Sequence, residues 1–212
     1  NFSDHGANRL GANSLLQACV DGYFIAPHTV MDYLAGQKPV SDNKDTLPSS
    51  IAKQENEVKQ RIQKLVNIKG NRHADMFHKE LGKILYNQCG LVRNEADLLA
   101  AKESLMKLKR SFYTDLLIPG TVHNINFELE KAARVEDYLD LAMLIVEDAL
   151  QRRESCGAHF REEFQTSSGE AQRNDEEFQY VSAWETSGDG DFKLHKELLK
   201  FHHVKITERS YQ

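Results

Sequence analysis

The strongest constraint on this fold is a series of apolar stripes at helical spacing between residues 49 and 154. The longest predicted helix runs from about Phe127 to Glu154. Its apolar positions, which we expect to face a core, are Leu129, Ala132, Ala133, Tyr138, Leu141, Ala142, Ile145, Val146 and Ala149. The acidic residues between them, expected mostly to face water, are Glu136, Asp137, Asp140, Glu147 and Asp148. A helix with one wide apolar face must pack against other elements, which indicates a bundle.

Three shorter segments show the same spacing. We expect helices over 49–69 and 73–87, and a third that begins at the N-cap Asn94 and ends before Pro119-Gly120. Gly70 suits the C-cap of the first. Their stripes are Ile51, Val58, Ile62, Leu65 and Val66; Met76, Phe77, Leu81, Ile84 and Leu85; and Leu98, Ala101, Leu105, Leu108 and Phe112. Residues 49–155 are therefore predicted to form a small helical bundle.

The chain changes character on both sides of this bundle. Residues 37–48 are polar with two prolines and are predicted to be a linker. After residue 155, short apolar runs at 178–184, 192–198 and 201–206 are separated by turn residues. Such runs are typical of two or three antiparallel strands, so 156–212 is predicted to be a strand-containing extension. The fold class is mainly α, with a short antiparallel β tail.

Composition excludes several classes of protein. The chain has 212 residues, a net charge of −5 and no basic block, which argues against nucleic-acid binding. No apolar run reaches the roughly 18 residues of a membrane span. Cys19, Cys89 and Cys156 are far apart and form no CxxC pair, so neither a zinc site nor a disulfide framework is indicated. Reduced thiols in a cytosolic compartment are the simplest interpretation.

The side chains that could carry other chemistry are scattered. No two of the nine histidines have the i,i+4 spacing of a metal site on a helix face, so each is expected to be structural or exposed to solvent. No GxSxG motif accompanies the serines, which excludes a hydrolase of that kind.

One cation stands out near the start of the chain. Arg9 lies between two small-residue turns, Gly6-Ala7 and Gly11-Ala12, and the chain then enters an apolar run through Asn13 and Ser14, both good N-cap residues. The planar guanidinium can hold a carboxylate, and unpaired helix N–H groups would stabilise negative charge such as that of a reduced flavin. Spacing alone nevertheless favours an ordinary loop with Arg9 in a surface salt bridge, because the segment is not a GxGxxG fingerprint.

Residues 5–16, HGANRLGANSLL, resemble the succinate dehydrogenase/fumarate reductase flavoprotein family almost letter for letter. The resemblance implies that Arg9 holds a carboxylate of succinate or fumarate. It also implies that backbone groups of Ser14 and Leu15 contact the FAD.

A second resemblance to the same family lies in the C-terminal third. The matching stretches are Glu154-Ser155-Cys156-Gly157-Ala158-His159, Arg173-Asn174-Asp175-Glu176, the aromatic Tyr180 and Trp184, and the tail Lys205–Tyr211. Two positions depart from the family pattern, because Cys156 replaces an Arg and Asn174 replaces an Asp. For this reason His159 and Arg161 are given no role beyond local structure.

If the resemblance holds, the chain is the C-terminal third of a flavoprotein, and 1–36 is the end of its FAD-binding domain. No complete set of catalytic residues is then expected here, and FAD belongs to the full-length protein rather than to this chain alone. The family implies electron transfer to an iron–sulfur subunit and to quinone at a membrane cytochrome b anchor. It also implies a peripheral position on the cytoplasmic side of the inner membrane.

Two alternatives remain open. L-Aspartate oxidase shares the HGANR segment and a helical C-terminal domain, but usually ends soon after its Ser-x-Gly-x-His segment. Here 53 residues follow His159, which favours the dehydrogenase. The other alternative is a helical interaction module without chemistry, which can describe the chain in isolation.

Overall fold

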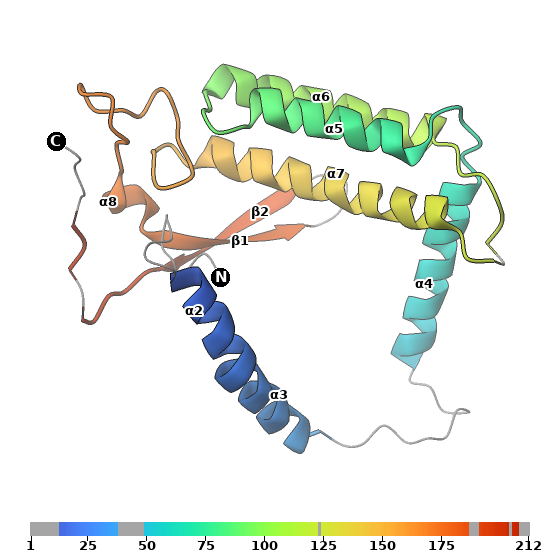
Figure 1. Ribbon diagram of the computed structural model, residues 1–212, viewed down its shortest axis with the longest axis horizontal. Helices are drawn as coiled ribbons and strands as arrows, with labels where there is room; N and C mark the ends of the chain where they lie inside the picture. The colour runs from blue at the N-terminus through green and yellow to red at the C-terminus, as the bar shows by residue number, and fades with distance from the viewer. Residues whose placement is uncertain (1–12, 38–48, 123, 187–190, 204, 208–212) are drawn as a thin grey trace. The chain divides into compact units, whose positions relative to one another are not determined.

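The computed structural model describes residues 13–37, 49–122, 124–186, 191–203 and 205–207 (Figure 1). The chain divides into two compact units, Asn1–Gln60 and Arg61–Gln212, and each is described by itself. Arg9 and all but the first residue of the predicted linker 37–48 lie outside the described residues.

The first unit contains one helical run with a π segment inside it. The run consists of α2 (Asn13–Val20), the π-helix η1 (Asp21–Ile25) and α3 (Ala26–Ala35). Gly22 lies inside the π segment and Pro27 lies at the start of α3, and neither ends the helical run. Pro27 stands in the first turn of α3, directly after the π segment, where a missing N–H is best tolerated. The run ends at Ala35, and Gly36 is its C-cap.

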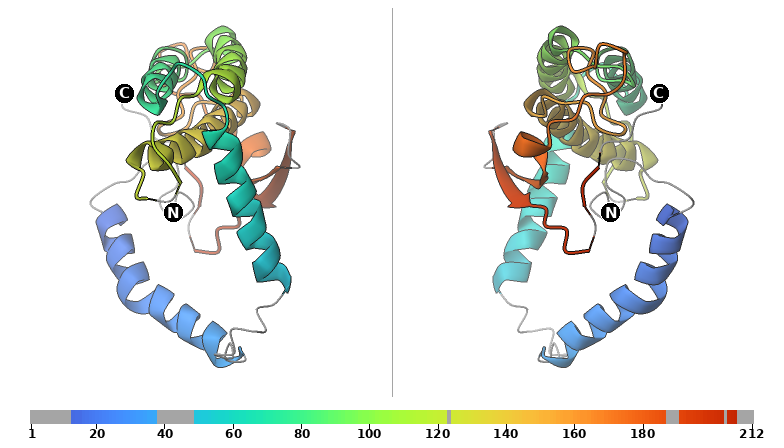
Figure 2. Two further views of the ribbon diagram at one scale, coloured as in Figure 1. Left: turned by 90° about the vertical axis from the view of Figure 1, so that its right-hand side faces the viewer. Right: turned by 90° about the vertical axis from the view of Figure 1, so that its left-hand side faces the viewer.

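Three helices form the bundle of the second unit: α5 (Ala74–Gln88), α6 (Glu95–Asp115) and α7 (Phe127–Gln151). They lie side by side in both views of Figure 2. The rings of Phe77 and Phe112 meet edge to face at the centre, with 5.3 Å between centroids. Leu65, from the last turn of α4 (Ser49–Val66), joins the same core. The predicted helical bundle is confirmed.

The helix boundaries follow local hydrogen bonds. Asn94 caps α6 as predicted, because its Oδ1 accepts from the backbone N–H of Asp97 at 2.8 Å. The first predicted helix ends at Val66 rather than Lys69, and Gly70 is not its cap. Instead, Gly70 passes so close to the backbone of Asp115 that a Cβ would lie 2.0 Å from its carbonyl carbon.

The buried face of α7 differs from the predicted one. Tyr138, Leu141 and Ile145 are at least 40% exposed, although we expected them in the core. The core is filled instead by Val135, Leu139 and Met143, together with the predicted Ala132, Ala142, Val146 and Ala149. The apolar surface of α7 is therefore wider than the face that α5 and α6 cover.

Glu136 on α7 is also an exception, because it was expected to face water and is only 7% exposed. Its carboxylate accepts a hydrogen bond from the hydroxyl of Tyr113 at 2.7 Å and pairs with the guanidinium of Arg61. Burial, together with the nearby Glu136 carboxylate, raises the pKa of Tyr113 above its ordinary value. A buried charge needs such partners, so this cluster fixes the end of α4 on α6 and α7.

A two-stranded antiparallel sheet follows the bundle. After the short α8 (Asp175–Phe178), strand β1 (Tyr180–Thr186) pairs with β2 (Phe192–Leu198), with Tyr180 opposite Leu198. The indole Nε1 of Trp184 donates to Asp148 of α7 at 2.8 Å and ties the hairpin to the bundle. Two of the predicted strands are confirmed, but Phe178 belongs to α8, and the described residues of 201–206 form no strand. The predicted class, mainly α with a small β element, is confirmed.

Two glycines, one in a helix and one in a loop, test where the fold requires a residue without a side chain. Gly82 lies inside α5, and a Cβ added there would meet no atom of another element within 4 Å. We expect Gly82→Ala to stabilise the chain by about 1 kcal/mol, because alanine loses less backbone entropy in a helix. Urea unfolding followed by circular dichroism measures this change.

Gly70→Ala is the matched control. The same added methyl would clash with the backbone of Asp115, so we expect the free energy of unfolding to fall by about 1–3 kcal/mol. A loss of stability in Gly82→Ala would contradict the packing described for α5.

Candidate functional site

The predicted flavin and substrate segment is described only from its helix onward. Arg9 lies outside the described residues, while Ser14 and Leu15 stand in the first turn of α2, which begins at Asn13. Asn13 is the first residue of this segment that the structure describes, so the expected N-cap role of Asn13 or Ser14 stays a prediction. Ser14 is half-buried and Leu15 is 68% exposed. The positions of these residues relative to Arg9 stay a prediction.

The first turn of α2 has the chemistry of an anion-binding helix end. The described first turn contains no acidic residue. Further along, the side-chain amide of Gln17 donates to Asp21 at 2.8 Å, so this acid is engaged about two turns beyond Asn13. The arrangement suits a negatively charged or electron-rich group in front of Ser14 and Leu15.

The second matching region forms a buried polar corner. We call residues 152–174, which follow α7, the C-terminal arm. Ser155 is fully buried, and its Oγ donates to the carbonyl of Arg161 at 3.0 Å and accepts from the Arg161 N–H at 2.8 Å. The Arg161 guanidinium, 2% exposed, donates to the carbonyl of Ala149 at 3.0 Å. These bonds close the end of α7 and satisfy a buried cation.

The arm is also bonded to the start of α6. The N–H of Arg93 donates to Phe160 at 3.0 Å, and the N–H of Glu162 donates to the carbonyl of Arg93 at 2.8 Å. The Glu163 carboxylate accepts from the N–H of Glu95 in the first turn of α6 and from the Arg161 guanidinium. These hydrogen bonds lower the pKa of Glu163 and outweigh the effect of burial.

A buried carboxylate organises the other side of the arm. Glu154, 3% exposed, accepts from the Arg152 guanidinium and from the backbone N–H of Asn174, each at 2.8 Å. Arg152 also lies over the rings of Phe178 and Tyr180, with distances of 5.7 and 5.2 Å to their centroids. Glu154 therefore connects the end of α7 with the start of α8.

The two departures from the family pattern have different consequences. Asn174 caps α8 by accepting from the N–H of Glu177 at 3.2 Å, a task that Asn and Asp perform about equally well. Cys156 sits half-buried in a tight turn in which Gly157 has a φ of 61°. Burial and the Glu154 charge raise the pKa of its thiol, so it is a poor nucleophile.

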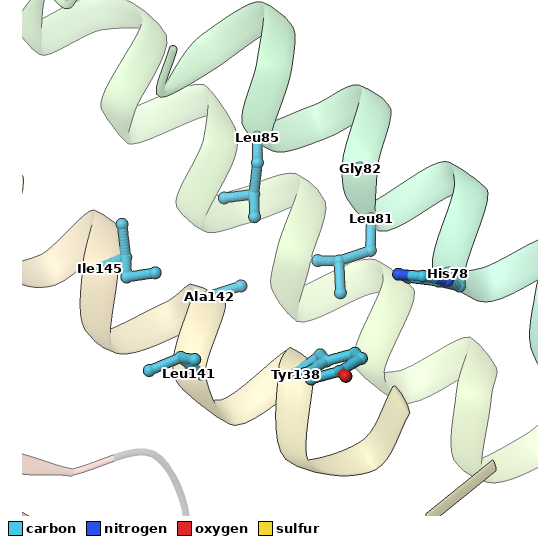
Figure 3. Close-up of a pocket in the computed structure, with 8 residues that line it drawn as sticks. All are labelled: His78, Leu81, Gly82, Leu85, Tyr138, Leu141, Ala142 and Ile145. Atoms are coloured by element: carbon cyan, nitrogen blue, oxygen red, sulfur yellow. The ribbon is translucent and has the colours of Figure 1, made fainter. Parts of the chain in front are cut away.

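A shallow apolar groove runs between α5 and α7 (Figure 3). Its volume is about 250 Å³. It is lined by His78, Leu81, Gly82, Leu85, Tyr138, Leu141, Ala142 and Ile145. The His78 and Tyr138 rings lie 5.6 Å apart at one end. Without a cationic Lys or Arg among its lining residues, the groove is not suited to hold a dicarboxylate.

Within the ranges that the structure describes, no group of three or more His, Cys, Asp or Glu side chains could hold a metal ion. Over the same residues, no helix combines the length and the apolar character needed to cross a membrane.

Sequence reasoning missed the partners that join the arm to the bundle. Arg93 and Arg161 are 68 positions apart and were not linked, and Arg152 and Glu163 were not singled out. No spacing signal could have found these pairs, because they depend on how the arm folds back over the ends of α6 and α7.

Comparison with known proteins gives a consistent result. A family model described as "Fumarate reductase flavoprotein C-term" matches residues 78–211. The chain is 29% identical over 177 residues to the succinate dehydrogenase flavoprotein subunit of Bacillus subtilis, covering 84% of this chain and 28% of that protein. It is also 29% identical to the fumarate reductase flavoprotein subunit of Haemophilus influenzae, covering 74% of this chain and 25% of that protein.

Solved structures agree with the sequence matches. An E. coli quinol fumarate reductase is similar with a TM-score of 0.80 and 26% identity, over 96% of this chain and 33% of that one. The Mycobacterium smegmatis Sdh1 complex gives a TM-score of 0.71 at 25% identity, over 94% and 32% of the two chains.

The chain thus spans little more than a quarter of the curated relatives it matches. The family match covers most of this chain and includes the region after His159. The chain belongs to the succinate dehydrogenase/fumarate reductase flavoprotein family and corresponds to its C-terminal region.

Proposed function

We propose that this chain is the C-terminal part of an FAD-dependent oxidoreductase that interconverts succinate and fumarate. The observation that carries the proposal is the family match over residues 78–211, joined to the HGANRLGANSLL segment at residues 5–16. The relatives named above are succinate dehydrogenase and fumarate reductase flavoprotein subunits, which supports both the reaction and the cofactor.

In this proposal the substrate is held by Arg9. Two parallel N–H donors of its guanidinium would bind one carboxylate bidentately, and this fixes the orientation of the carbon that reacts. The fork geometry matters more than the charge, because a lysine provides only a point charge on a flexible stem.

Ser14 and Leu15 would hold the cofactor through the start of α2. Their backbone N–H groups carry the positive end of the helix dipole, and no acidic side chain in the first turn opposes it. The exposed Leu15 side chain leaves apolar surface for a flat ring to cover. Bound FAD would supply the two-electron chemistry that none of the amino-acid side chains can perform.

The proposed partners follow from the relatives. The similar structures are a quinol fumarate reductase and an Sdh1 complex, which supports assembly with an iron–sulfur subunit and a membrane cytochrome b anchor. Electrons would leave the flavoprotein through that subunit toward quinone. We place the whole protein peripherally on the cytoplasmic side of the inner membrane.

L-Aspartate oxidase remains the alternative enzyme. The two reactions are separated by a direct assay, because the full-length protein should reduce a dye with succinate and not with L-aspartate. Activity with L-aspartate alone would establish the alternative.

We predict that Arg9→Lys in the full-length flavoprotein lowers kcat/KM for succinate by about 100-fold or more while FAD stays bound. The loss reflects a carboxylate that is attracted but no longer oriented. Steady-state kinetics and the visible absorption spectrum measure the two effects separately.

The matched control is Arg134→Lys, which changes an exposed arginine paired with Glu130 on α7. This variant should keep normal kinetics, since surface ion pairs of this kind contribute less than about 1 kcal/mol. Near-normal activity of Arg9→Lys would mean that the carboxylate is held elsewhere.

We also predict that the purified 212-residue chain is colourless and inactive. By the resemblance, most contacts to FAD belong to parts of the family that this chain does not include. An absorption spectrum after incubation with FAD and gel filtration tests this. A yellow chain that reduces a dye with succinate would refute the prediction.

A further inference from the structure

The imidazole of His159 is held between two partners of fixed hydrogen-bonding character. Its Nδ1 lies 2.8 Å from the Arg93 guanidinium, and its Nε2 lies 2.8 Å from the carbonyl oxygen of Arg152. Arg93 belongs to the turn between α5 and α6, whereas Arg152 follows α7. One half-buried ring therefore joins the C-terminal arm to a turn 66 residues earlier in the chain.

These partners determine the protonation state of the ring. A guanidinium can only donate, so Nδ1 must accept, and a carbonyl can only accept, so Nε2 must carry the hydrogen. Only the neutral Nε2–H tautomer satisfies both contacts. A proton added to Nδ1 would place two donors face to face and would break the Arg93 contact.

The surrounding charges act in the same direction. Burial of the ring lowers its pKa, and the positive charges of Arg93, Arg161 and Arg152 lower it further, against the opposing hydrogen bond to the Arg152 carbonyl. Two carboxylates at this corner, Glu154 and Glu163, are paired with Arg152 and Arg161, and the exposed Glu162 accepts from the side-chain amide of Asn94 at 3.2 Å.

Two thiols also lie at this corner, together with the ion pair of Arg173 and Asp175. Cys89 is buried at the end of α5, and Cys156 lies in the turn that contains His159. Burial raises the pKa of each thiol, so both stay neutral in the range where histidine titrates. A positive charge on His159 would therefore be repelled by three arginines. The carboxylates named above already have hydrogen-bonding partners of their own.

His159 lies next to two isolated β-bridges of the C-terminal arm. The N–H of Cys156 donates to the carbonyl of His159 at 2.8 Å, and His159 donates back to Cys156 at 3.1 Å. On its other side, Arg93 and Arg161 form a parallel bridge through the hydrogen bonds to Phe160 and Glu162. Loss of the contact between Arg93 and His159 removes the side-chain link between these two bridges.

We propose that His159 is a pH-sensitive clamp, whose protonation releases the C-terminal arm from the turn between α5 and α6. In the closed arm the ring is neutral, while in the opened arm it titrates near the ordinary value of 6.5. Opening is therefore coupled to proton uptake. The arm is held fully above about pH 6.5 and is weakened as the pH falls below it.

Amide hydrogen exchange of the 212-residue chain tests the clamp. The reporters are the N–H groups of Arg93, Cys156 and Glu162, whose acceptors lie across the two bridges. After correction for intrinsic exchange rates, we expect protection of these amides to fall by up to about tenfold between about pH 7.5 and pH 5.5. Amides in the middle of α6, such as Leu105, serve as the internal reference and should change less.

The variant His159→Gln keeps one acceptor and one donor but cannot titrate in this range. We expect it to retain protection at pH 7.5 and to lose the pH dependence. His195→Gln, in which the half-exposed partner of Glu185 is changed, is the matched control and should open with acid like the unaltered chain. Acid opening that persists in His159→Gln, or disappears in His195→Gln, would overturn the proposal.

A second measurement covers the case in which glutamine fails to support the arm. Nitrogen NMR of the unaltered chain reports the tautomer and the pKa of His159 directly. The clamp requires the Nε2–H tautomer at neutral pH and a pKa below 6.5. A ring protonated at Nδ1, or a pKa at or above 6.5, would overturn it.

Discussion

The C-terminal half of this structure depends on one buried cation. The Arg161 guanidinium is almost completely removed from water, and a charge in that position is tolerated only when its donors are used. The guanidinium donates to the carbonyl of Ala149 near the end of α7 and to the carboxylate of Glu163. The backbone of Arg161 exchanges two hydrogen bonds with the hydroxyl of Ser155. Ala149 lies in α7, whereas Ser155 and Glu163 belong to the C-terminal arm, so this one residue joins the arm to the end of α7.

The apolar core and this polar corner have different roles. The core between α5, α6 and α7 supplies the area that leaves water, and its helical stripes would tolerate many apolar residues of similar volume. The polar corner fixes the path of the C-terminal arm after α7, because buried hydrogen bonds have strict geometry. The hairpin of β1 and β2 follows this corner and is fixed to α7 by the bond between Trp184 and Asp148.

The proposed chemistry lies in another part of the chain. The described first turn of α2 contains no acidic side chain, and the helical run continues through the π segment and past Pro27 to Ala35. The bundle residues therefore supply architecture, while the segment from Arg9 to Leu15 would supply contacts to substrate and cofactor. This division explains why the HGANR segment could be interpreted without the rest of the fold.

The sequence by itself determined the helices, their main core residues and the capping Asn94, because these depend on spacing and on hydrogen bonds only a few residues long. The resemblance to the flavoprotein family was also evident from residues 5–16. The geometry around Arg9 stays a prediction.

Only the tertiary structure decided which face of α7 is buried, and thereby left Tyr138, Leu141 and Ile145 at the groove while Glu136 went inside. It alone paired Arg93 with His159, and it turned Gly70 from an expected cap into a point of close backbone contact. The physical reason is the same in each case. Helix periodicity is encoded over four residues, but the burial of a charge or the clash of a Cβ depends on an atom brought close by folding from tens of positions away.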